Sequence, residues 1–235
     1  MLGGILWGSS GTRPDLAYAA GLLARVQNLP GPEHWNALVG VCHYIKGMFD
    51  YGILIHKPSD SEITTPGLGL TQLGYVDSDW AGCADTRRST SGYIFMMAGA
   101  PIAWASKRQS VVALSSTEAE YIAIARGAQQ AMWLAEFMDQ ALLPQPTPFI
   151  LLGDNLGSIS LTKTTKGHQL SKHIDIRHHF LRDLVESQRL EVKPVRTNDN
   201  IADIMTKPLS KNVHNRFIRI LGLDWMRERA RQGEC

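Results

Sequence analysis

The chain has 235 residues, of which 44% are apolar and 20% charged, enough to bury one substantial hydrophobic core with room for a smaller annex. The formal net charge is only +2 at pH 7, which excludes a strongly basic field over the whole molecule. Lysines and arginines nevertheless gather from Lys163 onward, where a local groove could be positive.

The cysteine pattern and the absence of a long apolar run bear on the compartment. Cys42, Cys83 and Cys235 are odd in number and far apart, which argues against a disulfide framework. No apolar run approaches the roughly 18 residues that a bilayer span needs, and the first residues lack the layout of a secretory signal. We therefore expect an intracellular protein, cytoplasmic or nuclear, that is not secreted and has no membrane partner.

Two helices are predicted near the start of the chain. After a glycine-rich beginning, residues 14–27 and 32–48 place apolar side chains at helical spacing, and each run opens near a proline suited to a first helical turn. A short extended piece follows at 52–57. The Pro/Ser/Thr/Gly-rich stretch 58–69 is the best linker candidate. The sequence thus predicts a small helical annex over residues 1–57.

The pattern after the linker is that of a mixed α/β (α+β) domain over residues 70–222. Short β-prone runs predict three successive antiparallel strands, and a long helix and a buried strand follow them. The predicted strands are 70–79, 91–97, 102–107, 148–153 and 190–195; the predicted helices are 117–142, one from about Asn155, 174–188, 200–206 and 212–221. Residues 223–235 are predicted to form a flexible tail.

Two aspartates close apolar runs. Asp77 ends the first predicted strand and Asp154 ends the fourth. The end of a buried strand is a costly place for a charge, so both are candidates for a functional site. Asp154 could instead cap the following helix.

The long helix offers two glutamates with different surroundings. Ser115 and Glu118 have the spacing of a capping box, which gives Glu118 a structural role. Steps of three and four residues from Glu120 meet small and apolar side chains, so Glu120 should face the sheet. Asp203, inside the predicted helix 200–206, is a fourth candidate, although it could merely favour the positive end of that helix.

Several carboxylates in one place repel one another and take up protons unless cations neutralise them. Such hard oxygen ligands suit Mg²⁺ or Mn²⁺. Two ions about 4 Å apart can position a water and stabilise the leaving oxygen of a phosphodiester. We therefore predict metal-dependent phosphodiester hydrolysis with two Mg²⁺ ions, or Mn²⁺ in their place, and we keep Asp79 as a reserve ligand.

Three further groups of side chains each have a structural and a functional interpretation. The histidines are predicted to serve packing, hydrogen bonding or a minor-groove contact in preference to zinc, because no paired cysteines accompany them. The tryptophans are predicted to be core rather than base-stacking residues, and the basic side chains either meet phosphates or are simply solvated. The three groups are His168, His173, His178 and His179; Trp80, Trp104 and Trp133; and Arg87, Arg88, Lys107, Arg108, Lys172 and Arg177.

Six motifs carry a family resemblance over about residues 73–221. In chain order they are GYVDSDWAG, RRSTSGYIF, ALSSTEAEYIAI, LLGDNLGSISL, KHIDIRHHFLRD and NDNIADIMTKPL, and this series closely resembles the ribonuclease H domain of copia-type retrotransposon polyproteins. The resemblance implies a ribonuclease H-like fold, a five-stranded mixed sheet flanked by helices. It also implies an Asp-Glu-Asp-Asp set at Asp77, Glu120, Asp154 and Asp203 that holds the metal ions.

The N-terminal motifs TRPDLAYAAG and HWNALVGVCHYIKG are similar to the last part of the reverse transcriptase of the same polyproteins, without a polymerase site. The resemblance implies an RNA:DNA hybrid as substrate and the reverse transcriptase portion as partner.

Small polar groups beside the carboxylates are hypothetical sensors of 2′-hydroxyls, namely Ser78, Ser115, Ser116 and Asn155. Many other ribonucleases H have a histidine before the last aspartate. Residues 194–198 contain none, which raises a question about rate. The alternative function is a catalytically idle relic that at most binds hybrid.

Overall fold

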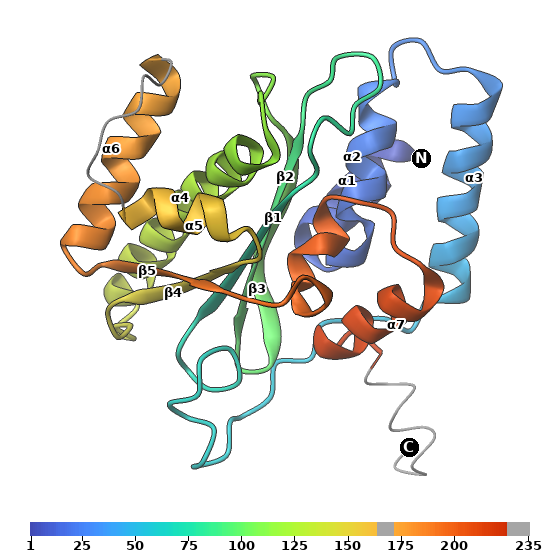
Figure 1. The fold of residues 1–235 in the computed structure, drawn as a ribbon. Helices are drawn as coiled ribbons and strands as arrows, with labels where there is room; N and C mark the ends of the chain where they lie inside the picture. Colours follow the sequence, from blue (N-terminus) through green and yellow to red (C-terminus); the bar gives the residue numbers. More distant parts are fainter. Residues whose placement is uncertain (164–171, 225–235) are drawn as a thin grey trace.

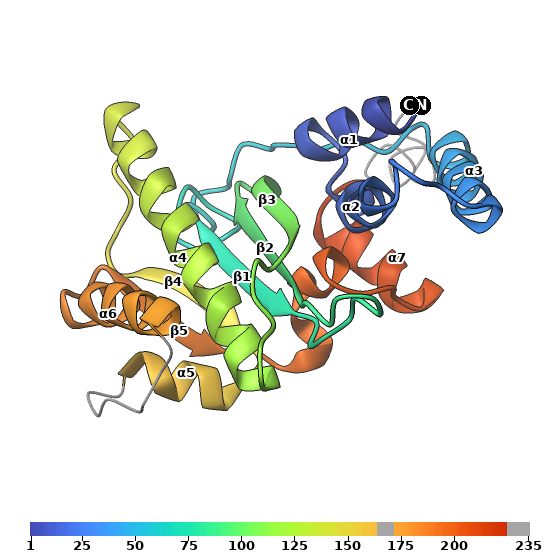
Figure 2. The ribbon, with the colours of Figure 1, turned by 90° about the horizontal axis from the view of Figure 1, so that it is seen from above.

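A computed structural model of the protein describes residues 1–163 and 172–224, without the side chains of 172–176 and 178. None of the helices in these ranges combines the length and the apolar character needed to cross a membrane. The chain folds around one central sheet with helices on both faces (Figures 1 and 2).

The sheet has five strands in the order β3-β2-β1-β4-β5. The first three strands in the chain pair antiparallel as successive neighbours, whereas β4 runs parallel to β1, and β5 runs parallel to β4. This topology confirms the predicted five-stranded mixed sheet. The strands are β1 (Leu73–Ser78), β2 (Thr90–Met97), β3 (Ala100–Arg108), β4 (Phe149–Gly153) and β5 (Leu190–Pro194).

Three helices, α4 (Ser116–Gln140), α5 (Leu156–Lys163) and α6 (Lys172–Glu186), cover one face of the sheet, as Figure 2 shows. Their apolar side chains and those of the strands form the first core, which includes Val76 and Leu151. Both residues are fully buried, which is the environment expected of adjacent parallel strands under a covering helix.

The N-terminal helices and the described elements that follow β5 cover the other face (Figure 2). A second core joins strand residues such as Ile94 to Phe217, with Ala17 and Tyr51 from the N-terminal part packed against it. The elements are α1 (Leu2–Gly11), η1 (Pro14–Leu16), α2 (Ala17–Arg25), α3 (Pro32–Gly47), η2 (Thr197–Asp199), η3 (Ile201–Met205) and α7 (Lys211–Ile220).

The structure differs from the predicted elements mainly at the N-terminus. Helix α1 was not predicted, because its four glycines lower the intrinsic helix propensity, yet burial of Ile5 against the neighbouring helices stabilises it. The predicted helix 200–206 is a 3₁₀ helix. Local propensity is overridden in α1 by tertiary packing.

The predicted linker and the end of the domain are both tied to the body of the protein. The turn between β2 and β3 donates two hydrogen bonds to the linker, from Ala98 N to Gly69 O at 2.8 Å and from Gly99 N to Gly67 O at 3.0 Å. Leu223 is fully buried, and its carbonyl accepts a hydrogen bond from Gly52 N. Packing therefore extends past the predicted boundary at 222; residues 225–235 lie outside the described part of the chain.

Gly127 lets α4 approach the sheet closely, and this leads to a prediction. A Cβ at Gly127 would lie 2.5 Å from Val76 Cγ1, too close for either to remain in place. Gly127→Ala should therefore lower the free energy of unfolding by about 1–3 kcal/mol despite the better helix propensity of alanine. Urea denaturation measures the difference.

Gly40 in α3 is the matched control, because a Cβ there would have no neighbour within 4 Å. Gly40→Ala should raise the free energy of unfolding by up to about 1 kcal/mol. Equal effects of the two substitutions would show that close packing at Gly127 is unimportant.

Candidate active site

Three carboxylates converge at one edge of the sheet. Asp77 lies near the end of β1, Asp154 directly follows β4, and Glu120 projects from the second turn of α4. Because β1 and β4 are parallel, their carboxyl ends meet at the same edge. One oxygen from each of the three carboxylates lies within 4.8 Å of the other two. The structure thus brings the carboxylates of the predicted residues Asp77, Glu120 and Asp154 into one cluster.

The start of α4 positions Glu120 in the way that the capping-box spacing predicted. Ser115 Oγ accepts a hydrogen bond of 3.1 Å from Glu118 N, and Glu118 Oε2 accepts one of 2.8 Å from Leu114 N. The glutamate of the cap thus serves the helix end, and Glu120 turns inward. Its Oε1 accepts a hydrogen bond of 3.3 Å from Ser78 N, which ties the helix to β1 beside Asp77.

Asp154 does not cap the helix that follows it. Asn155 Oδ1 accepts a hydrogen bond of 2.8 Å from Ser158 N, so Asn155 is the capping residue of α5. The alternative interpretation of Asp154 as a helix cap is therefore wrong. Its half-buried carboxylate instead faces Asp77 and Glu120.

Asp203 approaches the cluster from η3 and is linked to it through a cation. Lys207 Nζ lies 2.8 Å from Asp203 Oδ1 and 3.7 Å from Asp77 Oδ2. Thr206 Oγ1 also donates a hydrogen bond to Asp77 Oδ2. Asn200 Nδ2 donates to Val76 O at 2.8 Å and so holds η3 against β1.

Sequence reasoning missed the roles of Asn200, Thr206 and Lys207, although all three lie in the motif NDNIADIMTKPL. The available signal was the four-residue spacing of Asp203 and Lys207, which places opposite charges on one side of a helical turn. The contacts to Asp77 could not have been found in this way, because they join residues about 130 positions apart in the chain.

Burial and mutual repulsion raise the pKa values of these acids. Burial raises the pKa of Asp77, and the charge of Lys207 only partly opposes this. Burial, with the charges of Asp77 and Asp154, raises the pKa of Glu120 to about 9. Burial and then Asp77 raise the pKa of Asp203 to about 7. The site therefore holds protons near neutral pH when no added cation balances its charge.

The donor set fits a hard divalent cation. All the side-chain atoms that converge are carboxylate oxygens, the ligands that Mg²⁺ and Mn²⁺ prefer. Lys207 lies close to Asp77 and Asp203. Its single positive charge does not balance the negative charge of four ionised carboxylates. The residues present thus fit the metal that the sequence predicted.

The raised pKa values predict how stability depends on pH without metal. A carboxyl with a higher pKa in the folded than in the unfolded state stabilises the fold while both states are protonated and loses this contribution as pH rises. The unfolded carboxyls titrate near pH 4, whereas the folded Glu120 titrates near 9. The melting temperature of the metal-free protein should fall between about pH 5 and about pH 9.

Mg²⁺ should raise the melting temperature more at the alkaline end of this range, because it binds the ionised carboxylates. Scanning calorimetry with and without Mg²⁺ measures both trends. Glu120→Gln should flatten the pH dependence. A melting temperature that rises with pH in the wild-type protein without metal would contradict the prediction.

The remaining predicted residues have various surroundings. Asp79 accepts a hydrogen bond from Thr90 N in the β1–β2 connection and is not one of the three converging residues. Ser78 Oγ already accepts from Gln109 Nε2 at 3.2 Å and donates to Asp79 O. Ser116 is exposed at the start of α4. Arg177 is half-buried on α6, and the side chain of Lys172 lies outside the described part.

Two predictions about aromatic and histidine residues have different outcomes. Trp80 and Trp133 are 56% and 57% exposed, so their assignment to the core is wrong, whereas the half-buried Trp104 packs against the second core. Alternation along the chain cannot tell an exposed indole from a buried one. Among the histidines, His179 is exposed with Nδ1 2.9 Å from Arg182 Nη2. His168 and the side chains of His173 and His178 lie outside the described residues.

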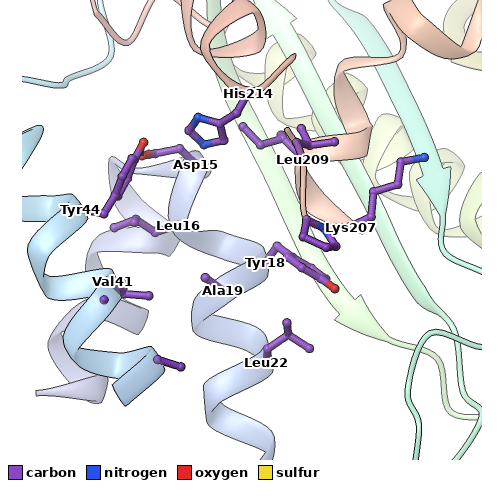
Figure 3. Close-up of a pocket in the computed structure, with 14 residues that line it drawn as sticks. Asp15, Leu16, Tyr18, Ala19, Leu22, Val41, Tyr44, Lys207, Leu209 and His214 are labelled. Atoms are coloured by element: carbon purple, nitrogen blue, oxygen red, sulfur yellow. Dashed lines mark hydrogen bonds between the residues drawn. The ribbon is translucent and has the colours of Figure 1, made fainter. Parts of the chain in front are cut away.

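A cavity of about 450 Å³ lies between α2, α3 and the segment from η3 to α7 (Figure 3). Leu16, Tyr18 and Leu209 are among the residues that line it. In Figure 3 the ammonium of Lys207 points away from this cavity and toward the sheet. The cavity therefore adjoins the base of Lys207 and is separate from the carboxylates.

The mixed sheet and the carboxylates at the ends of β1 and β4 and on α4 define a ribonuclease H-like domain. No family model matches the chain. It is 38% identical over 212 residues to a retrovirus-related Pol polyprotein from transposon RE2 of Arabidopsis thaliana, covering 90% of the chain and 14% of that protein. It is 35% identical over 222 residues to that from transposon TNT 1-94 of Nicotiana tabacum, covering 94% and 16%.

A shorter relative, the secreted RxLR effector protein 161 of Plasmopara viticola, is 44% identical over 133 residues, which cover 57% of the chain and 87% of that protein. The chain is homologous to retrovirus-related Pol polyproteins of copia-type transposons over most of its length. It spans only 14 to 16% of the two polyproteins named above.

Solved structures with similar folds are more distant. Ribonuclease H1 of Halobacterium salinarum is 14% identical with a TM-score of 0.43, covering 58% of this chain and 94% of that one. LC11-RNase H1 in complex with an RNA/DNA hybrid is 12% identical with a TM-score of 0.44 and the same coverage.

Proposed function

We propose that this protein is a metal-dependent endonuclease that hydrolyses the RNA strand of RNA:DNA hybrids. The observation that carries the proposal is the convergence of Asp77, Glu120 and Asp154 within 4.8 Å at one edge of the sheet. Homology to the copia-type Pol polyproteins supports the same activity. Catalytic roles for Asp77, Glu120, Asp154 and Asp203 are part of this proposal.

Two Mg²⁺ ions, or Mn²⁺ in their place, would be held by Asp77, Glu120, Asp154 and Asp203. When bound, divalent ions supply Lewis acidity to the scissile phosphate and lower the pKa of an attacking water. Asp77 would be the central ligand, because its charge acts on both Glu120 and Asp203 and, after burial, is the first cause of the raised pKa of each.

The surrounding residues hold these carboxylates in place. The hydroxyl of Thr206 and the ammonium of Lys207 orient Asp77, and the amide of Ser78 orients Glu120. Burial opposes the charge on Lys207, but Asp77 and then Asp203 raise its pKa above the usual value. Lys207 therefore remains charged and can screen the approach of a phosphate to Asp203.

Recognition of RNA would depend on groups that meet 2′-hydroxyls in the minor groove. We assign this role to Ser78, Ser115, Ser116 and Asn155, with phosphate contacts from Lys172 and Arg177. Ser115 and Asn155 also cap helices, and Ser78 is already hydrogen-bonded, so the exposed Ser116 is the residue most open to substrate.

Alanine at each of the four sensor positions should reduce discrimination between RNA and DNA strands before it abolishes cleavage. Parallel cleavage rates on a hybrid and on the matching DNA duplex measure this ratio. Ser116→Ala should change it with the least effect on the melting temperature, because Ser116 makes no hydrogen bond to another described side chain. Unchanged selectivity in all four variants would refute the assignment.

We also propose a partner and a cellular compartment for the protein. Residues 1–57 correspond to the C-terminal end of the reverse transcriptase and residues 58–69 to a linker, so the reverse transcriptase portion of the polyprotein is the proposed partner. The protein would act inside the cell, in the cytoplasm or the nucleus.

The test is cleavage of a labelled RNA:DNA hybrid in Mg²⁺, alongside single-stranded RNA and duplex DNA of the same sequence. A chelator and the Asp154→Asn variant are the controls, because the chelator removes the metal ion and the variant removes one of its carboxylate ligands. Cleavage of hybrid RNA alone, lost in both controls, is the expected result. No cleavage, or cleavage that is indifferent to Asp154, would favour an idle relic that at most binds hybrid.

A further inference from the structure

A polar groove of about 340 Å³ runs beside α4 on the side of β2 and β3, outside the carboxylate cluster. We call it the α4 groove and define it by Tyr93, Lys107, Arg126, Gln129 and Gln130, which line it. Among the residues that the structure describes, no carboxylate lines the groove. Two cationic side chains, those of Lys107 and Arg126, thus line a hollow to which the described residues contribute no carboxylate.

Arg126 is half-buried, and its guanidinium is incompletely matched. One of its N–H groups donates a long hydrogen bond of 3.4 Å to Lys107 O, and no described carboxylate forms an ion pair with it. Burial lowers the pKa of Arg126; Tyr93 opposes this shift, and the positive charge of Arg177 adds to it. A guanidinium has five donors in a fixed planar fork, a geometry that suits phosphate.

The neighbouring amides present donors to the same hollow. Tyr93 Oη donates a hydrogen bond of 3.0 Å to Gln130 Oε1, so the carbonyl end of this amide is occupied. The NH₂ end of Gln130 therefore remains as a donor. Gln129, one residue earlier, is exposed at the rim of the groove. The guanidinium of Arg126 and the amide N–H groups of Gln130 are therefore suited to bind an anion.

The groove is adjacent to the carboxylate cluster along α4 and through Gln109. Arg126 is six residues beyond Glu120 on α4, which corresponds to about 9 Å along the helix axis at 1.5 Å per residue. Ser91, which lines the groove, also accepts a hydrogen bond of 2.9 Å from Gln109 Nε2, the amide that contacts Ser78 in the site.

We propose that the α4 groove binds a backbone phosphodiester of the nucleic-acid substrate outside the carboxylate cluster, held mainly by Arg126 and Lys107. This inference rests on the proposed function for the nature of the substrate. The groove binds without regard to sequence, because a phosphate has none to read.

The experiment measures binding of a labelled RNA:DNA hybrid to the full chain by fluorescence anisotropy, with a chelator present so that nothing is cut, over a series of salt concentrations. Arg126→Gln should reduce the salt slope of the binding constant by about one and weaken binding about tenfold at about 0.1 M salt. Lys107→Gln should act in the same direction, and Arg126→Lys should retain part of the slope.

Arg189→Gln is the matched control, since Arg189 is exposed and precedes β5 at the opposite end of the sheet from Asp154. It should leave the slope unchanged. If Arg126→Gln fails to fold, as judged by its melting curve, the exposed Lys107 decides the question. Wild-type slope and affinity in Lys107→Gln and in a folded Arg126→Gln would overturn the inference.

Inorganic phosphate forms a separate arm. Should it raise the melting temperature through Arg126 while hybrid binding is indifferent to Arg126, the groove is a site for free phosphate and the inference fails. Cleavage of the hybrid by the wild-type protein, with hybrid binding that is indifferent to Arg126 and Lys107, leaves the proposed function intact and refutes the groove. Hybrid binding that depends on Arg126, in a wild-type protein that does not cleave, supports the groove and refutes the proposed nuclease function. A wild-type chain that does not bind hybrid overturns both.

Discussion

Replacement of Asp77 by asparagine should reduce hybrid cleavage at least about a thousandfold, since loss of an outer-shell partner of a metal ligand alone costs roughly 10–100-fold. Asp77 is 2% exposed and is the carboxylate that the structure places next to both Glu120 and Lys207. Asparagine has the same shape but cannot supply a negative charge to a metal. The initial rate of RNA cleavage in Mg²⁺ measures the effect.

The same variant should keep its fold. Thr206 can still donate to the remaining carbonyl oxygen, and the repulsion of Asp77 with Asp154 and Glu120 disappears. The metal-free variant should therefore melt no lower than the metal-free wild type at alkaline pH. Asp139→Asn, on the exposed last turn of α4, is the matched control and should retain full activity. An active Asp77→Asn variant would exclude this site as the catalytic centre.

Asp15→Ala should lower the free energy of unfolding by about 3–5 kcal/mol, because it leaves a buried guanidinium without its counterion. The Asp15 side chain is fully buried, and Arg13 donates to it twice, from Nε at 2.9 Å and Nη2 at 2.7 Å. Tyr44 Oη donates a third hydrogen bond to Asp15, and burial followed by Asp15 raises the pKa of Tyr44. Equilibrium urea unfolding measures the loss.

The effect should reach the nuclease site, because the N-terminal helices share the second core with η3, the element that carries Asp203. We expect a lower rate of hybrid cleavage near the unfolding midpoint of the variant. Asp60→Ala in the exposed linker is the control and should change stability by less than about 0.5 kcal/mol. If Asp15→Ala unfolds like the wild type, the N-terminal part is not anchored by this network.

The strand-end aspartates and the face of α4 were predictable from the chain alone. Asp77 and Asp154 close apolar runs, and the stripe of small residues that contains Glu120 and Gly127 matches the side of α4 that the structure packs on β1. These features depend on periodicity and on the cost of burying a charge, both of which are local.

The residue pattern by itself indicated three successive antiparallel strands, most helix bounds, and carboxylates at two strand ends and on the inner face of α4, because hydrophobic period is read locally along the chain. The five-stranded mixed sheet was expected from the family resemblance. Only the tertiary structure decided that Asn155 rather than Asp154 caps α5, that Lys207 bridges Asp203 to Asp77, and that a glycine-rich start is helical. Each of these depends on contacts with residues that are distant in sequence or on a choice between adjacent polar side chains, and local propensity carries no information about either.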